Sequence, residues 1–277
     1  MLATDVIRAL TPADHAACVA LSRDRDWPPE EHKWRLLLEV GEGYGIDDPD
    51  GGLAGSVVLT RYAPGAVAIS MMLVAARRER QGLGTRLMAH ALERAGDGPV
   101  FLYATELGRP LYERLGFRTA VTSTMLIGRY RGAADGASRA ATEADRGAIR
   151  ALDAAALGVD RGALLDRLPR FADRIRVLER DGAPFGYAAA WRNGEVTAMG
   201  PVIAGDPAAA RSLVAGLGAD IDGPVRLDLT DDQPELQAWA SEQGLVSGMV
   251  TSFMVHGGRS LPGERSRVVA PFMQALG

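Results

Sequence analysis

The chain has 277 residues, of which 47% are hydrophobic and 24% charged, and its formal net charge is −4. This length and composition suit two ordinary globular domains. Apolar runs stay shorter than the roughly 18 residues that span a bilayer, the N-terminus lacks a signal-peptide pattern, and the arginines are scattered among acids rather than gathered in a stripe. We therefore expect a cytoplasmic protein that binds neither membrane nor nucleic acid.

Taken in chain order, the first half predicts alternating strands and helices. A strand precedes two helices between Thr11 and Val40, and strands are expected at 43–46, 53–62 and 67–74. Apolar residues at helical spacing predict a helix over 84–95, followed by a strand at 100–104, a helix at 109–115 and a strand at 119–127. This order is typical of an α/β fold, here with a mixed, mostly antiparallel sheet flanked by helices.

The second half repeats landmarks of the first half at nearly the same spacing. The pairs are Thr11-Pro12-Ala13-Asp14 with Thr142-Glu143-Ala144-Asp145, Gly55 with Gly186, Gly116 with Gly244, and the run 122–126 with 251–255. Their shared order predicts two copies of one fold. We place the first copy at 1–130, a linker rich in small residues at 131–140, and the second copy at 141–277.

A glycine loop lies between the predicted strand at 67–74 and the helix that follows. Gly82 and Gly84 permit a tight turn, so that consecutive N–H groups at the start of the helix can point at an anion. Arg77, Arg78 and Arg80 add positive charge nearby. The pattern indicates a pyrophosphate site.

Together with the segment Leu111-Tyr112-Glu113-Arg114-Leu115-Gly116-Phe117, this loop resembles the GCN5-related N-acetyltransferase (GNAT) family over about residues 5–128. The resemblance implies an enzyme that uses acetyl-CoA as co-substrate. It implies that the backbone near Leu73 and Val74 pairs with the pantetheine arm and binds the acyl oxygen, and that Tyr112 contacts the cofactor and protonates the leaving thiolate. The residues implied to hold the pyrophosphate are Arg80, Gln81, Gly82, Leu83, Gly84 and Thr85. Glu79 departs from the family pattern, which has arginine or glutamine there.

The second copy lacks both features. At the position of the loop it reads Gly205-Asp206-Pro207-Ala208, without a second glycine, and the Asp206 carboxylate would repel a phosphate. Ala240 stands at the position of Tyr112. We therefore expect an active first copy and a degenerate second copy that shapes the substrate site or forms an interface.

The acceptor side is less determined by the sequence. Asp26 and Glu30, in the loop between the first two helices, are candidate bases for the attacking ammonium, and a water chain is the alternative. Candidate substrate contacts are Trp27, Glu31 and Glu106, with Trp34 as either a pocket wall or a core residue.

Metal and redox chemistry have no support in the sequence. The single cysteine, Cys18, lies in an apolar helix pattern and is expected to be a small buried side chain. The four histidines lack metal-ligand spacing, so we expect no metal site, and only His32 is expected near a substrate.

The leading hypothesis is acetylation of the amine of a small molecule or amino-acid derivative, because the acidic first loop suits a cationic acceptor. A protein or peptide N-acetyltransferase and a non-catalytic acyl-CoA sensor are the alternatives. Tandem GNAT mycothiol synthases are a further comparison, but their active copy is the second, whereas the motifs here lie in the first. The identity of the amine and the formation of a homodimer remain open.

Overall fold

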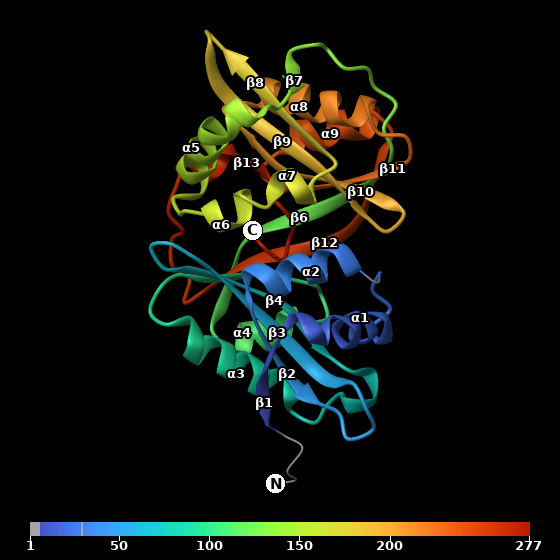
Figure 1. Ribbon diagram of the computed structural model, residues 1–277, viewed down its shortest axis with the longest axis vertical. Helices are drawn as coiled ribbons and strands as arrows, with labels where there is room; N and C mark the ends of the chain where they lie inside the picture. Colours follow the sequence, from blue (N-terminus) through green and yellow to red (C-terminus); the bar gives the residue numbers. More distant parts are fainter. Residues whose placement is uncertain (1–5, 29) are drawn as a thin grey trace.

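The computed structural model describes residues 6–28 and 30–277, and it has two halves, one above the other in Figure 1. Each half has a mixed, mostly antiparallel sheet flanked by helices, which confirms the predicted fold class. The elements of the first copy are β1 (Ile7–Leu10), α1 (His15–Asp24), α2 (Glu31–Val40), β2 (Glu42–Asp47), β3 (Leu53–Tyr62), β4 (Ala66–Val74), α3 (Leu83–Ala95), β5 (Val100–Ala104), α4 (Arg109–Arg114) and β6 (Phe117–Arg129).

The second copy follows the same order, with three helices in place of two after its first strand and an additional strand at its end. Its elements are β7 (Ser138–Ala140), α5 (Arg146–Leu157), α6 (Gly162–Leu165), α7 (Leu168–Phe171), β8 (Arg174–Arg180), β9 (Ala183–Asn193), β10 (Val196–Ala204), α8 (Pro207–Ala219), β11 (Pro224–Thr230), α9 (Pro234–Glu242), β12 (Leu245–His256) and β13 (Val268–Ala270). No helix of the described residues is long and apolar enough to cross a membrane.

The repeat predicted from the landmarks is visible in the packing of helix on sheet. In each copy a strand glycine lets a leucine of the following helix approach the sheet closely. A Cβ atom at Gly55 would lie 2.9 Å from Leu87 of α3, and one at Gly186 would lie 3.0 Å from Leu213 of α8. The same Cβ atoms would lie 2.9 Å from the Leu73 backbone oxygen and 2.8 Å from the Ile203 backbone oxygen, so equivalent close packing favours glycine in both copies.

The turn before the first long helix is also repeated. The N–H of Thr11 donates to the Asp14 carboxylate at 2.8 Å, and the N–H of Thr142 donates to that of Asp145 at 2.7 Å. Each pair closes a capping box that satisfies backbone donors at the start of the helix.

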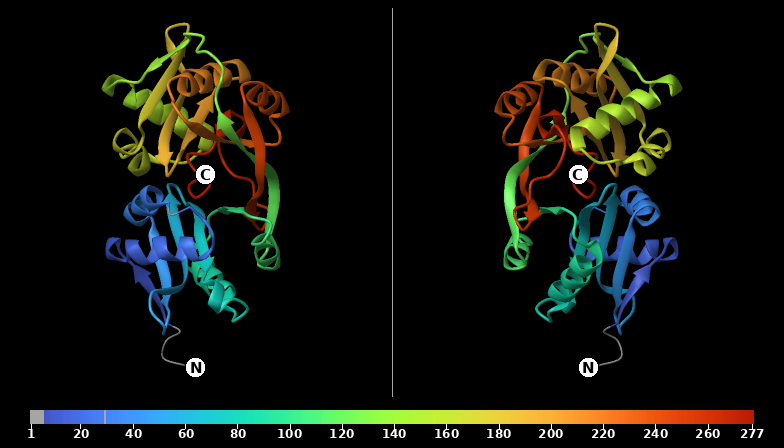
Figure 2. Two further views of the ribbon diagram at one scale, coloured as in Figure 1. Left: turned by 90° about the vertical axis from the view of Figure 1, so that its right-hand side faces the viewer. Right: turned by 90° about the vertical axis from the view of Figure 1, so that its left-hand side faces the viewer.

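The two copies exchange their last strands. The strand order is β1-β2-β3-β4-β5-β12-β6-β11-β10-β9-β8-β7, so β12 pairs with β5 of the first copy and β6 pairs with β11 of the second. Figure 2 shows these two long strands running side by side between the halves. The predicted boundary at 130 therefore divides the sequence but not the sheet, and the predicted linker at 131–140 contains β7.

The chain after β12 returns to the space between the halves, where the C mark lies in Figure 1. The hydroxyl of Tyr62 donates to the Leu276 carbonyl at 2.7 Å, and Arg161 donates to the Gly277 carbonyl at 2.5 Å. Arg161 also makes a bidentate pair with Asp153, and both side chains are almost completely buried. This ion pair fixes the final segment between the two copies.

Candidate active site

A cleft opens in the first copy where the parallel strands β4 and β5 diverge. They pair only at Val67 with Val100 and at Ala68 with Phe101, while β3 covers the other edge of β4 up to Val74. Beyond Ala68, the second edge of β4 faces a cavity of about 570 Å³. Backbone groups along this edge can pair with an extended ligand as they would with an added strand.

A bulge in β4 shapes the wall of this cleft. The register with β3 shifts after Ser56, and Met71 has a left-handed φ of 48°. The buried Ser56 hydroxyl donates to the Met71 carbonyl at 2.9 Å and so holds this strained conformation. Fixed backbone distortions of this kind concentrate at functional sites.

The glycine loop connects β4 to the start of α3. Gly82 has a φ of 79°, a value that favours glycine, and Arg80 has a φ of 60°. No side chain caps α3, so its first N–H groups, on Leu83, Gly84 and Thr85, have no acceptor within the helix. These residues line the cleft, and their N–H groups form an anion site at the positive end of the helix dipole.

The arginines around the loop divide into two sets. Arg77 and Arg78 bind Asp48 at 2.9 and 2.8 Å, which fixes the turn before the loop. Hydrogen bonding from Arg78 lowers the pKa of Asp48 to about 2. Arg80 and Arg114 line the cleft and have no ion-pair partner in the part of the chain that the structure describes. These two guanidinium groups are therefore available to phosphates.

Tyr112 lies on α4 and lines the same cleft. Its ring packs edge-on against Phe117, and its hydroxyl has no hydrogen-bond partner among residues 6–28 and 30–277. Burial raises the pKa of Tyr112 to about 12. The hydroxyl consequently stays protonated at neutral pH and can donate a hydrogen bond into the cleft.

A second cavity, of about 300 Å³, adjoins the cleft and lies between the two copies. Ser70, Met71, Tyr103 and Thr105 line both cavities and form their junction. The first copy contributes the loop before α2, and the second copy contributes β9, β10, β11 and the segment 271–275. A reactant in this cavity therefore meets the cofactor cleft beside the bulge of β4.

Family models described as the acetyltransferase (GNAT) domain match residues 42–119 and 149–270. The chain is a tandem GNAT protein. A relative from Bacillus subtilis, the uncharacterized N-acetyltransferase YitH, is 26% identical over 258 residues and covers 91% of each chain. Proteins of this family transfer an acyl group from an acyl-CoA to an amine.

Two solved structures share the tandem GNAT fold at low sequence identity. A putative acetyltransferase from Pyrococcus horikoshii has a TM-score of 0.84 and 19% identity, with coverage of 100% of this chain and 97% of that one. A tandem GNAT protein from the clavulanic acid biosynthesis pathway has a TM-score of 0.63 and 14% identity, with coverage of 92% and 99%. The resemblance first seen over about residues 5–128 thus extends to both halves of the chain.

Most residues predicted to bind the cofactor line the cleft of the first GNAT copy. They are Leu73, Val74, Arg80, Gly82, Leu83, Gly84, Thr85 and Tyr112. Gln81 belongs to the same loop, but its side chain is exposed and does not line the cleft. Glu79, which departs from the GNAT pattern, is neutralised by Arg25 at 2.6 Å.

The residues predicted for the acceptor separate into two groups. Asp26, Trp27 and Glu30 line the second cavity. Glu31 and Glu106 are exposed and line neither cavity, and Glu31 is paired with Arg23 at 3.4 Å. The structure therefore brings neither Glu31 nor Glu106 to these cavities.

The expectation that His32 lies near a substrate is not met, because neither His32 nor Trp34, which the sequence leaves open between pocket wall and core, lines the second cavity. His32 stacks on Phe171 with ring centroids 4.1 Å apart and lines a different surface hollow. Trp34 is fully buried, and its indole N–H donates to the Ser22 hydroxyl at 2.8 Å. Trp34 is thus a core residue.

Sequence reasoning missed the wall that the second GNAT copy contributes to the second cavity. This wall includes Trp191, Asn193, Arg226, Phe272 and Gln274. The available signal was the presence of polar residues near apolar ones, as at Asn193 at the end of β9 and Arg226 on β11. It gave no indication that those strands face the first copy.

In the second GNAT copy the corresponding cleft is filled by the protein itself. β10 and β11 also diverge beyond Met199, but β13 pairs with β10 at Val202 and Ile203 on the edge that faces β11. Asp206 caps α8 by accepting the Ala209 N–H at 2.8 Å. A strand and a carboxylate of the chain thus stand where the first copy leaves an open edge and an uncapped helix.

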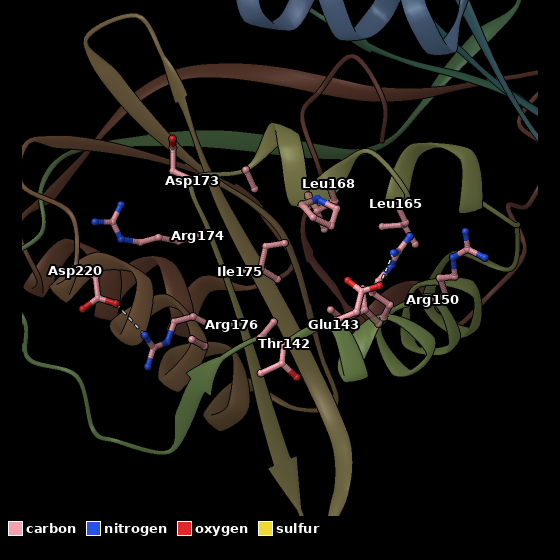
Figure 3. Close-up of a pocket in the computed structure, with 16 residues that line it drawn as sticks. Thr142, Glu143, Arg150, Leu165, Leu168, Asp173, Arg174, Ile175, Arg176 and Asp220 are labelled. Carbon is pink, nitrogen blue, oxygen red and sulfur yellow. Dashed lines mark hydrogen bonds and ion pairs between the residues drawn. The ribbon is translucent and has the colours of Figure 1, made fainter.

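The second copy also carries a surface hollow of about 410 Å³ beside β8 and α5, drawn in Figure 3. Its arginines are largely neutralised, because Arg146 and Arg150 bind Asp166 and Arg176 binds Asp220. It shares no lining residue with the two cavities described above, so we assign it no role in catalysis.

The prediction that Cys18 is buried is confirmed. Burial raises the pKa of its thiol to about 12, so it is a poor nucleophile. Within the described residues, no group of three or more His, Cys, Asp or Glu side chains is arranged to hold a metal ion.

Proposed function

We propose that this protein is an acetyl-CoA-dependent N-acetyltransferase that acts on the primary amine of a small molecule, with the first GNAT copy as its catalytic unit. The supporting observation is the junction of two cavities. The open cleft along β4 meets an acceptor cavity of about 300 Å³ at Ser70, Met71, Tyr103 and Thr105. A thioester laid along β4 would present its carbonyl at this junction.

Three features of the cleft fit acetyl-CoA. The free edge of β4 can pair with the pantetheine arm. The uncapped start of α3, with Arg80 and Arg114, can hold phosphates. The backbone near Leu73 and Val74 follows the bulge at Met71, where a fixed N–H can donate to the thioester oxygen as negative charge develops on it.

Transfer is direct in this proposal. The amine nitrogen attacks the thioester carbonyl carbon, the C–N bond forms, and the C–S bond breaks with its electron pair on sulfur. Tyr112 donates a hydrogen bond to that sulfur. Its pKa of about 12 lies above the roughly 8.5 of a thiol, so full proton transfer is uphill and the hydroxyl acts mainly by hydrogen bonding.

The ammonium of the acceptor must lose a proton before it attacks, because an alkylammonium has a pKa of about 10. Glu30 is already paired with Lys33 at 2.5 Å. Asp26 lines the acceptor cavity and has no side-chain partner in the described chain. We therefore propose Asp26 as the base, directly or through water, and Glu30 as a residue that positions the acceptor.

The size of the acceptor cavity favours a small molecule over a protein. About 300 Å³ corresponds to roughly ten water molecules. The second GNAT copy and the segment 271–275 cover this cavity, where a protein acceptor would need an open groove.

The test is an acceptor screen with acetyl-CoA, in which free thiol and acetylated product are both measured. We expect acetylation of small primary amines and little acetylation of peptides. Acetylation of peptides alone would favour the protein N-acetyltransferase. Binding of acetyl-CoA without acetylation of any amine would favour the non-catalytic sensor.

A further inference from the structure

The acceptor cavity contains buried polar atoms without partners. Among the described residues, Ser70 Oγ, Asn193 Oδ1 and Gln274 Nε2 are buried and have no hydrogen-bond partner, and all three residues line this cavity. Leaving a buried polar group unsatisfied costs about 1–3 kcal/mol. Such a cluster in one cavity indicates that a ligand completes its hydrogen bonds.

The orientation of the Asn193 amide follows from its neighbour. Asn193 Nδ2 donates to Glu30 Oε1 at 3.3 Å, which leaves Oδ1 as a free acceptor. Gln274 Nε2 is the free donor in the same cavity. The two residues, both from the second copy, therefore offer one acceptor and one donor.

Most charges in this cavity are compensated within it. Lys33 Nζ lies 2.5 Å from Glu30, and Arg226 makes two hydrogen bonds of 2.9 Å to Asp228. Asp26 is the remaining charged group, and it is exposed to solvent. A charged group deep in the cavity would find no counter-charge of its own, and burying it would be costly.

The rest of the wall is apolar. Trp191, Phe272 and Met273 line the cavity and are all buried. They suit a hydrocarbon stem that joins the reacting amine to the group held by Asn193 and Gln274.

We infer that the acceptor is an amine on a short apolar stem that ends in an uncharged group able to donate and accept hydrogen bonds, namely a hydroxyl or a carboxamide. Either group can donate to Asn193 Oδ1 and accept from Gln274 Nε2 together, whereas an ammonium cannot accept and a carboxylate cannot donate. Asn193 and Gln274 are then specificity-determining residues. This inference rests on the proposed function.

The experiment uses five amines with the same carbon chain that end in a methyl, hydroxyl, carboxamide, ammonium or carboxylate group. Binding of each to the full chain with CoA present is measured by calorimetry, and kcat/KM is measured with acetyl-CoA. We expect the hydroxyl and carboxamide compounds to exceed the other three by roughly five- to a hundredfold in both measurements.

The two measurements separate this inference from the proposed function. The same binding preference without acetylation would support the inference and contradict the proposed function. Acetylation with no preference, or with the charged amines preferred, would overturn the inference and leave the proposed function intact. Absence of binding by all five amines would also overturn it.

Variants assign the preference to particular residues. Asn193→Leu and Gln274→Leu should each reduce the ratio between hydroxyl-ended and methyl-ended amines by roughly five- to a hundredfold. Arg192→Ala is the matched control, because Arg192 adjoins Asn193 on β9 but is exposed and does not line the cavity. An unchanged ratio in both leucine variants would contradict the assignment.

Discussion

The first GNAT copy leaves the gap between its diverging strands open, whereas the second copy fills the same gap with its own chain. In the first copy no strand of the described residues pairs with β4 beyond Ala68 on this edge, and Gly82 provides no side-chain cap for α3. In the second copy β13 lies along β10, and Asp206 caps α8. The frameworks are otherwise alike down to the glycine-leucine contacts at Gly55 and Gly186.

Under the proposed function, the capacity to bind a cofactor depends on what occupies the cleft rather than on the framework. A backbone strand can replace a pantetheine arm because both use the same main-chain hydrogen bonds. A carboxylate can replace a phosphate because both are anions that bind free N–H groups at the start of a helix. The variants below test this comparison, from the largest expected effect to the smallest.

The final segment, which follows β13, is held by the buried pair between Asp153 and Arg161. Asp153→Leu leaves the Arg161 charge buried and unpaired, and should lower the free energy of unfolding by about 3–5 kcal/mol. Chemical denaturation measures this loss. Glu235→Gln removes one partner of an exposed pair and is the control, with a change within about 0.5 kcal/mol. Equal effects in the two variants would contradict the assigned role of the pair.

Gly82→Asp should make the start of α3 in the first copy resemble the start of α8 in the second copy, where Asp206 stands. The new carboxylate would stand at the uncapped start of α3 and weaken acetyl-CoA binding by roughly a hundredfold or more, through like-charge repulsion. Calorimetric titration measures the affinity. Gly82→Asn is the matched control, because asparagine has the same shape and tolerates a φ of 79° without adding charge. If both variants lost affinity equally, shape rather than charge would be responsible.

Tyr112→Phe removes from the first copy the hydroxyl that the second copy also lacks, because Ala240 stands at the corresponding position. The ring and its packing on Phe117 remain, so acetyl-CoA affinity and thermal stability should be nearly unchanged. Turnover should fall by roughly ten- to a hundredfold, the effect of losing a hydrogen bond to a charged group. A variant with the wild-type rate would identify Tyr112 as a packing residue only.

Asp206→Ala removes the cap of α8 and should cost about 1 kcal/mol of stability. The stoichiometry of acetyl-CoA should remain one per chain, because β13 still fills the second cleft. Binding of a second acetyl-CoA in the variant would show that Asp206 alone closes this site.

The contribution of Asp206 also has a predictable pH dependence. Hydrogen bonding from Arg180 and from the Ala209 N–H lowers the pKa of Asp206 below its ordinary value of 3.8. The stabilisation is therefore fully present above about that pH and is lost as the pH falls through the lowered pKa. Thermal unfolding of the wild type and Asp206→Ala should converge in acid.

Local signals allowed much of this structure to be predicted from the sequence. The glycine loop, Tyr112 and the elements around them depend on short-range patterns, and α3 and β5 begin and end within one residue of the expected positions. The acceptor wall depends instead on which strands of the second copy face the first, which no local pattern specifies. Asn193 and Gln274 could not be predicted for this reason.

The strand exchange was unpredictable for a related reason. The run 122–126 in β6 and the run 251–255 in β12 have nearly the same pattern, so either strand can complete either sheet. Local sequence gives β12 no preference for β5, its partner in the first copy, over β11 of its own copy, which pairs with β6 instead. Only the tertiary arrangement determines which strand pairs with which copy.

The exchange makes this chain the covalent equivalent of a domain-swapped dimer. If the chain were cut at residue 130, each copy would keep a strand that pairs with the other copy in the intact chain. The first copy would keep β6, and the second would keep β12. The cut would also expose β5 and β11 as bare edges, which attract further strands and aggregate. The first copy therefore owes the strand beside β5 to the second copy, whatever the second copy contributes to catalysis.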